Sequence, residues 1–164
     1  LVLLYLPLLA YSTHMPKLEL DQPKETLQGM KVLVIDDMPI TLESMQNTFD
    51  LVDLTITTAE NGEEALDILT QDPNFDLIIT DKKMPYMNGI KFLEFILADP
   101  SITTCKTFIL QPASVSLELI KYIENLDAQA KRIDPEMQIK YIHKTYSIQD
   151  FFNFLDSVIT SQSN

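Results

Sequence analysis

The fold is decided by the stretch Phe75-Asp76-Leu77-Ile78-Ile79-Thr80-Asp81-Lys82-Lys83-Met84-Pro85-Tyr86-Met87-Asn88-Gly89. Residues 77–80 are apolar or β-branched in an unbroken run, which suits a parallel strand that is covered on both faces. The strand ends at Asp81, and open parallel sheets place their ligand sites just beyond the carboxyl ends of the strands. Asp81 is therefore a candidate functional residue. A lone Asp in this position more often only caps the following loop or helix.

Two further predicted strands also lead into charged residues. Residues 31–35 precede the acidic pair Asp36-Asp37, and residues 139–143 precede Lys144. In one parallel sheet these strand ends meet at the same edge, so three carboxylates and one ammonium should gather there. Carboxylates that lie this near to one another repel each other, and a bound divalent cation relieves the repulsion. Few oxygen ligands with water completing the shell suit Mg²⁺.

The rest of the chain alternates between helical and strand patterns. Helices are expected over residues 39–50, over 63–71, after Asn88, around Leu119 to Leu126 and after Ser147, with further strands at 54–57 and 107–110. Residues 127–138 are expected to form an unusually long connection. Five strands that alternate with five helices predict an α/β fold, with a parallel sheet and helices on both faces.

These features together resemble the receiver domain of bacterial two-component response regulators, over about residues 30–161. The resemblance implies a three-layer flavodoxin-like doubly wound sheet with strand order 2-1-3-4-5. That order would bring Asp36, Asp37 and Asp81 together. The residues that carry the resemblance are Asp36-Asp37, the stretch 59–66 (Ala-Glu-Asn-Gly-Glu-Glu-Ala-Leu), Asp81 with Met84-Pro85 and Gly89, and Lys144 followed by Tyr146.

The resemblance also implies a chemistry. Asp81 would accept a phosphoryl group from the phosphohistidine of a histidine kinase or a histidine phosphotransfer domain, and Lys144 would contact that group. Mg²⁺ would be held by Asp36, Asp37, Asp81 and the backbone carbonyl of Lys83. The Lys83 side chain would lie near the phosphoryl group. Such a domain is a signalling phosphoacceptor that assists its own phosphorylation, not an enzyme in the usual sense.

One part of the family pattern is missing. Receivers normally carry Thr or Ser at the end of the fourth strand, where this chain has Gln111 or Pro112, depending on a one-residue choice of alignment. Tyr141 matches the aromatic residue that changes rotamer on activation in many members. The missing hydroxyl and the long connection expected over residues 127–138 favour an alternative, a pseudo-receiver that acts as a phosphorylation-independent interaction module. A third hypothesis, a phosphatase of the haloacid dehalogenase type, has less support, because Lys83 stands where that family has a second Asp.

The amino-acid composition argues against two classes of binding partner. The net charge is −12, with 24 acidic and 12 basic residues. This balance argues against a nucleic-acid partner and against an anionic membrane surface, since both need a basic face. Cys105 is the only cysteine, so no intrachain disulfide is possible and a cytoplasmic location is expected.

The start of the chain is expected to lie outside the receiver domain. Residues 1–11 are almost wholly apolar, too short for a membrane span of about 20 residues, and expected to bury against the domain or in a homodimer. Residues 4–8 resemble the last strand of the ATP-binding domain of sensor histidine kinases, as in a hybrid kinase; a stray apolar leader is an equal alternative. His14 is expected to be an ordinary solvated histidine. The predicted division is 1–29, leader and linker, and 30–164, receiver domain.

Overall fold

The computed structural model describes residues 27–161 apart from 51, 53, 145 and 146. The predictions for the apolar leader, for His14 and for Tyr146 lie outside the described residues, as does most of the predicted linker.

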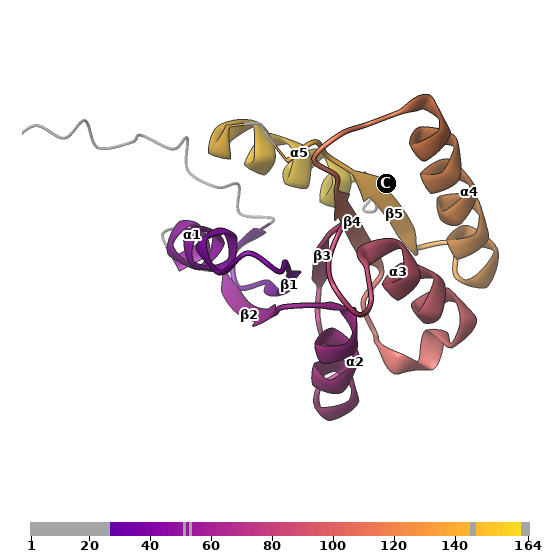
Figure 1. Ribbon diagram of the computed structural model, residues 1–164, viewed down its shortest axis with the longest axis horizontal. Coiled ribbons are helices and arrows are strands. Elements are labelled where there is room, and N and C mark those ends of the chain that lie inside the picture. Colours follow the sequence, from indigo (N-terminus) through magenta and orange to yellow (C-terminus); the bar gives the residue numbers. More distant parts are fainter. Residues whose placement is uncertain (1–26, 51, 53, 145–146, 162–164) are drawn as a thin grey trace, which may run out of the picture.

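The fold is a five-stranded parallel sheet in the order β2-β1-β3-β4-β5, with helices on both faces (Figure 1). The predicted α/β class and strand order are therefore confirmed. The strands are β1 (Lys31–Ile35), β2 (Thr55–Ala59), β3 (Leu77–Asp81), β4 (Thr107–Gln111) and β5 (Gln138–Tyr141). The helices are α1 (Pro39–Asp50), α2 (Gly62–Gln71), α3 (Gly89–Ala98), α4 (Leu117–Ile133) and α5 (Ile148–Thr160), with a short 3₁₀ helix η2 (Pro100–Ile102).

Side chains that point alternately to the two faces of the sheet form two apolar layers. Val32 and Val34 of β1 belong to the layer under α1 and α5, whereas Leu33 and Ile35 belong to the layer under α2, α3 and α4. Both faces of β1, β3 and β4 are buried, because side chains point alternately to opposite sides of the sheet. In the first layer, Phe49 of α1 stacks on Phe151 of α5 with 5.9 Å between ring centroids. The layers hold the central strands in place, and their carboxyl ends carry the site.

Polar side chains fix where four of the helices begin. Asn61, Asn88, Ser116 and Ser147 are the N-caps of α2, α3, α4 and α5, and each side chain accepts a backbone N–H of the first turn. Such caps are worth about 1 kcal/mol each. The predicted starts after Asn88 and Ser147 agree with this. The predicted helix 63–71 begins one residue earlier, at Gly62.

The prediction of a long connection over residues 127–138 is wrong. Helix α4 continues to Ile133, and Asp134 caps it by donating its N–H to the carbonyl of Ala130. Leu126 and Ala130 lie one turn apart and are both buried, so the helix keeps an apolar contact with the sheet throughout.

The fifth strand is also shifted from its predicted bounds. It spans Gln138–Tyr141 rather than 139–143, and Lys144 stands three residues beyond it. Backbone bonds from Ile142 to Leu110 and from Lys144 to Pro112 continue the pairing with the β4 side of the sheet. Lys144 is therefore held beside the end of β4, although it is not at the end of a strand.

Asp127 joins α4 to β5. One carboxylate oxygen accepts the Ile139 N–H at 2.8 Å, and the other lies 2.7 Å from Lys131 Nζ and 3.3 Å from Lys140 Nζ. Burial alone would raise the pKa of Asp127, but the bonds from Lys131 and Ile139 outweigh it and hold the pKa below its usual range.

We expect Asp127→Asn to lower the free energy of unfolding by about 1–2 kcal/mol at pH 7, because two ion pairs are lost. A lowered carboxyl pKa contributes stability above the unfolded-state pKa of about 4, and this is lost as the pH falls through the folded value. Urea unfolding at pH 7 and pH 3 should therefore show a difference that shrinks in acid. Glu124→Gln, an exposed change on the same helix, is the control, and an equal loss at both pH values would contradict the account.

Candidate functional site

Three of the predicted site residues meet at the carboxyl ends of β1 and β3. Asp36 follows β1 and Asp81 ends β3, and both are buried, with 1 % and 6 % of their surface exposed. Lys144 Nζ lies 2.6 Å from Asp36 Oδ2 and 3.3 Å from Asp81 Oδ1. The lysine therefore bridges two buried carboxylates that come from neighbouring strands.

The local backbone holds each carboxylate by one oxygen. Asp36 Oδ1 accepts the N–H of Met38 at 2.9 Å, and Asp81 Oδ2 accepts the N–H of Lys83 at 3.1 Å. The remaining oxygens, Asp36 Oδ2 and Asp81 Oδ1, are the ones near Lys144. Asp36 Oδ2 is buried and accepts no well-formed hydrogen bond in the described part of the chain, although the ammonium is close. A metal ion bound to this oxygen would share it with the Lys144 ammonium.

The start of α3 packs directly against the end of β3. A Cβ on Gly89 would lie 2.1 Å from the backbone carbonyl oxygen of Asp81 and 2.8 Å from Thr80 Oγ1. No side chain fits in that space, so the position requires glycine. The Thr80 hydroxyl donates to the same carbonyl at 3.0 Å. The loop between Asp81 and Gly89 is thereby fixed at both of its ends.

The charges of the site are set by burial and by one another. Burial raises the pKa of the Asp81 carboxyl, while the Lys144 ammonium acts in the opposite direction. Burial alone would lower the pKa of Lys144, but the carboxylates of Asp36 and Asp81 outweigh it and raise that pKa. Lys144 is therefore a permanent positive charge beside Asp81 at neutral pH.

Asp37 lies differently from its neighbour Asp36. It is exposed and lines a hollow of about 280 Å³ together with Asp81, Lys83 and Lys144. Within the described residues, no three His, Cys, Asp or Glu side chains are gathered closely enough to form a ready-made metal site. Asp37, Asp81 and the predicted backbone ligand Lys83 thus share one hollow, whereas Asp36 is not part of its lining, and the metal site stays a prediction.

The sheet register places Gln111 beside the candidate acceptor. Asp81 pairs with Gln111 at the end of β4, so Gln111 rather than Pro112 takes the position that the sequence left open between them. Gln111 and Pro112 are both buried, and the Pro112 carbonyl accepts the N–H of Lys144 at 3.1 Å. Tyr141 pairs with Leu110 and is half-buried against the apolar layer under α2, α3 and α4.

Ser114 lies three residues beyond Gln111, in the loop between β4 and α4. In the structure Ser114 lines the same hollow as Asp81. Lys82 also lines this hollow, a role that the sequence pattern does not indicate.

Sequence comparison decides the family. The response regulator receiver domain matches residues 32–137, which is more than half of the chain. This chain belongs to the response regulator receiver family. A receiver domain is a signalling domain, and a phosphoacceptor role is what the family supports.

The receiver matches parts of much longer proteins. It is 32 % identical to the transcriptional regulatory protein FlgR of Helicobacter pylori over 74 % of this chain and 31 % of that protein. It is 38 % identical to the two-component response regulator ARR10 of Arabidopsis thaliana over 42 % of this chain and 12 % of that protein. A terminal-differentiation specific adenylate cyclase of Dictyostelium discoideum matches 84 % of this chain at 24 % identity, over 7 % of its length.

Solved receiver domains have the same fold. A CheY-like receiver from Methanospirillum hungatei superimposes with a TM-score of 0.64 at 21 % identity and covers 82 % of this chain and 96 % of that one. The receiver domain of the Francisella response regulator 1452 gives a TM-score of 0.59 at 26 % identity, over 80 % and 98 %. Among the described residues, no helix is both long and apolar enough to cross a membrane.

Proposed function

We propose that this receiver accepts a phosphoryl group on Asp81 from the phosphohistidine of a histidine kinase or histidine phosphotransfer domain. The observation that carries the proposal is the Lys144 ammonium, held between the buried carboxylates of Asp36 and Asp81. A buried, positively charged contact beside a carboxylate is what phosphoryl transfer needs, because that reaction depends on positioning and on charge neutralisation.

Each residue then has a part in the transfer. Asp81 Oδ1 supplies the electron pair that forms the new bond to phosphorus, while the phosphorus–nitrogen bond of phosphohistidine breaks and its electrons stay on the imidazole. The N–H of Lys83 holds Asp81 Oδ2, so the carboxylate keeps one orientation. Lys144 stands within 3.3 Å of Asp81 Oδ1 and would contact a phosphoryl oxygen as the bond forms.

Mg²⁺ fits the donors that are present. Asp36 Oδ2 is a buried oxygen without a well-formed hydrogen bond, Asp37 and Asp81 line one hollow, and carboxylate oxygens are hard ligands of the kind Mg²⁺ takes. The ion would be held by Asp36, Asp37, Asp81 and the Lys83 carbonyl, with water completing its shell. When bound, it supplies further charge neutralisation.

We expect Asp36→Ala/Asp37→Ala to weaken Mg²⁺ binding by about tenfold or more, since even outer-shell partners of a metal contribute about that much. NMR titration with MgCl₂ measures the affinity, and circular dichroism checks that the variant is folded. Asp67→Asn, an exposed carboxylate change on α2, is the control. Unchanged affinity in the double variant would refute this ligand set.

A second candidate function is the pseudo-receiver, an interaction module that does not use phosphorylation. The observation that favours it is Gln111 beside Asp81, where a hydroxyl is normal for the family. Incubation with acetyl phosphate and Mg²⁺, followed by intact mass, separates the two candidates, because only the phosphoacceptor gains mass.

We also propose bounds, a location and partners for this domain. We place the receiver at residues 30–164, after a leader and linker at 1–29, in a cytoplasmic protein that contacts a histidine kinase or phosphotransfer domain. The receiver of a hybrid sensor kinase and a homodimer are arrangements compatible with the apolar start of the chain.

A further inference from the structure

The start of α2 is tied to the loop between β3 and α3, residues 82–88. Asn61 is the N-cap of α2, and its side chain accepts two backbone N–H groups of the first turn. The N–H of Gly62 donates instead to the backbone carbonyl of Met87 at 3.0 Å. The first N–H groups of a helix have no partner within the helix, and here one of them joins α2 to the loop.

The side chain of Met87 packs directly onto Gly62. A Cβ on Gly62 would lie 2.6 Å from Met87 Cγ, 2.9 Å from Met87 Sδ and 3.0 Å from Met87 Cβ. The same side chain packs against the apolar layer under α2, α3 and α4, where there is little spare room for it to move. A larger residue at position 62 would therefore push Met87, and the loop with it, out of place.

The residue before Met87 has an unfavourable backbone conformation. Tyr86 has a φ of 60°, in the left-handed region that residues other than glycine rarely adopt. Its side chain is 81 % exposed, so packing of that side chain does not hold the conformation. Backbone strain of this kind persists only where the surrounding structure fixes it. The two contacts between Met87 and Gly62 supply that support on one side of Tyr86.

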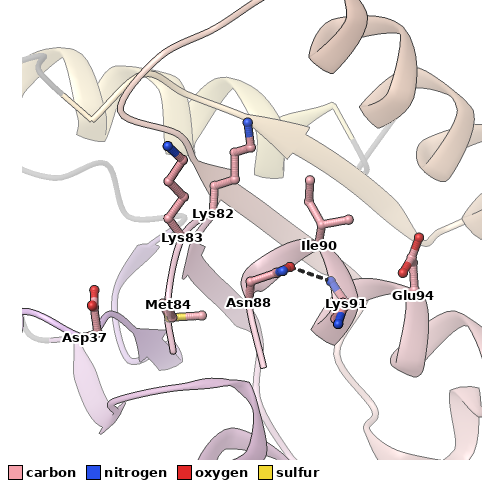
Figure 2. A pocket seen from close by; sticks show the side chains of 8 residues that line it. All are labelled: Asp37, Lys82, Lys83, Met84, Asn88, Ile90, Lys91 and Glu94. Atoms are coloured by element: carbon pink, nitrogen blue, oxygen red, sulfur yellow. Dashed lines mark hydrogen bonds between the residues drawn. The ribbon is translucent and has the colours of Figure 1, made fainter. Parts of the chain in front are cut away.

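The loop also borders an open hollow of about 580 Å³, which Figure 2 shows from close by. Lys82, Lys83 and Met84 line it from the loop, and Lys91 lines it from α3. Met87 and the residues of α2 are not part of this lining. Open space gives the loop no packed support, so the contact with α2 matters more for its path.

This path bears on the candidate acceptor through Lys83, which lies four residues before Met87. The N–H of Lys83 donates to Asp81 Oδ2 at 3.1 Å, and its carbonyl is one of the proposed Mg²⁺ ligands. Pro85 stands between Lys83 and Met87, and its ring fixes one backbone angle. A displacement of Met87 is therefore carried toward Lys83, because the short segment between them has little freedom to absorb it.

We infer that Gly62 and Met87 are positioning residues for the phosphorylation of Asp81. The inference rests on the proposed function and gives the stretch 59–66 a part in it. Neither residue is catalytic. Their contact sets the path of the loop, so that the Lys83 N–H holds the acceptor carboxylate and the Lys83 carbonyl keeps the place at which it would bind Mg²⁺.

Three variants test the contact. Gly62→Ala fills the space that the Met87 side chain occupies, Met87→Ala removes that side chain, and the double variant Gly62→Ala/Met87→Ala combines both changes. Glu63→Ala, an exposed change in the same turn of α2, is the matched control. Circular dichroism first shows that each variant is folded.

Each variant is measured in three ways. NMR of the metal-free protein follows the amide signal of Lys83, and titration with MgCl₂ gives the Mg²⁺ affinity. Intact mass at several concentrations of acetyl phosphate, with Mg²⁺ present, gives kcat/KM for labelling. The first two measurements do not depend on phosphorylation.

We expect Gly62→Ala to lower kcat/KM by about tenfold, because small misplacements of reacting groups cost that much or more. Its Mg²⁺ affinity should fall severalfold, and its Lys83 amide signal should shift before any metal is added. Met87→Ala should lose only about threefold, since the backbone hydrogen bond from Gly62 remains. The control should match the wild-type protein in all three measurements.

The double variant separates positioning from a general effect on α2. Once the Cγ and Sδ atoms of Met87 are gone, an added Cβ at position 62 no longer meets them. Residues in contact show such coupling, whereas independent ones have additive effects. The double variant should therefore label as fast as Met87→Ala, and faster than Gly62→Ala. A residue that only stabilised the helix would show no such rescue.

The inference is overturned if Gly62→Ala matches the wild-type protein in all three measurements, or if the double variant is no faster than Gly62→Ala. If Gly62→Ala does not fold, Met87→Ala carries the test, and an unchanged rate and Lys83 signal in that variant contradict the inference. If the wild-type protein gains no mass from acetyl phosphate, the proposed function fails and this inference falls with it. If the wild-type protein is labelled and the variants keep its rate, this inference alone fails.

Discussion

Asp81→Asn should abolish the gain in mass that acetyl phosphate and Mg²⁺ produce. An amide is not a nucleophile toward phosphorus under these conditions, whereas a carboxylate held beside an ammonium is. The substitution keeps the shape of the side chain and an oxygen that can accept the N–H of Lys83, which now lies 3.1 Å from Asp81 Oδ2. We therefore expect the labelling to disappear without loss of the fold.

The stability of the same variant provides an independent check. Burial raises the pKa of Asp81, so the ionised side chain is less favourable in the folded protein than in the unfolded chain, and this cost applies at pH values above the folded pKa. Asp81→Asn removes that cost at pH 7, and its melting temperature should equal or exceed that of the wild-type protein. Asp67→Asn should leave both labelling and melting unchanged. Undiminished labelling of the Asp81 variant would place the acceptor elsewhere.

Long apolar runs and capping residues carry most of the information about this fold. The strand at 77–80 could be predicted because its residues form an unbroken apolar or β-branched run that ends at Asp81. The second half of α4 could not, because its buried contacts there come from Ala130, a weak apolar signal. Asp127 adds to the difficulty: its partners Ile139 and Lys140 lie on β5, and a local pattern does not show contacts between distant segments.

Some features of the candidate site could likewise be predicted from the sequence, and others could not. The meeting of Asp36 and Asp81 follows from strand ends in one parallel sheet, so the sequence could predict it. Lys144 joins them from three residues beyond β5, where its N–H donates to the Pro112 carbonyl. The difference between buried Asp36 and exposed Asp37 could not be predicted, since it depends on how the chain turns after β1. The place of Ser114 and the hollow around Lys82 and Lys91 depend likewise on the paths of two loops, which no strand or helix pattern fixes.

The effect of phosphorylation on the rest of the domain depends on Gln111. By resemblance to the family, a hydroxyl at the end of the fourth strand moves to the phosphoryl group and an aromatic residue of the fifth strand then changes rotamer. Here Gln111 is paired with Asp81 in the sheet, and Tyr141 is half-buried behind it on the next strand. An amide on a longer side chain is a less well placed donor than a hydroxyl.

We expect beryllofluoride, which stands in for the phosphoryl group, to shift NMR signals mainly around Asp81 in the wild-type protein. Loss of a hydrogen bond to a charged group costs about 1.5–3 kcal/mol, which is roughly ten- to a hundredfold in the balance between two states. Gln111→Thr restores the hydroxyl, so its shifts should spread to Tyr141 and α4. Gln111→Val, which matches threonine in shape without the hydroxyl, should behave like the wild-type protein. Wide shifts through α4 in the wild-type protein would show that it switches without the hydroxyl.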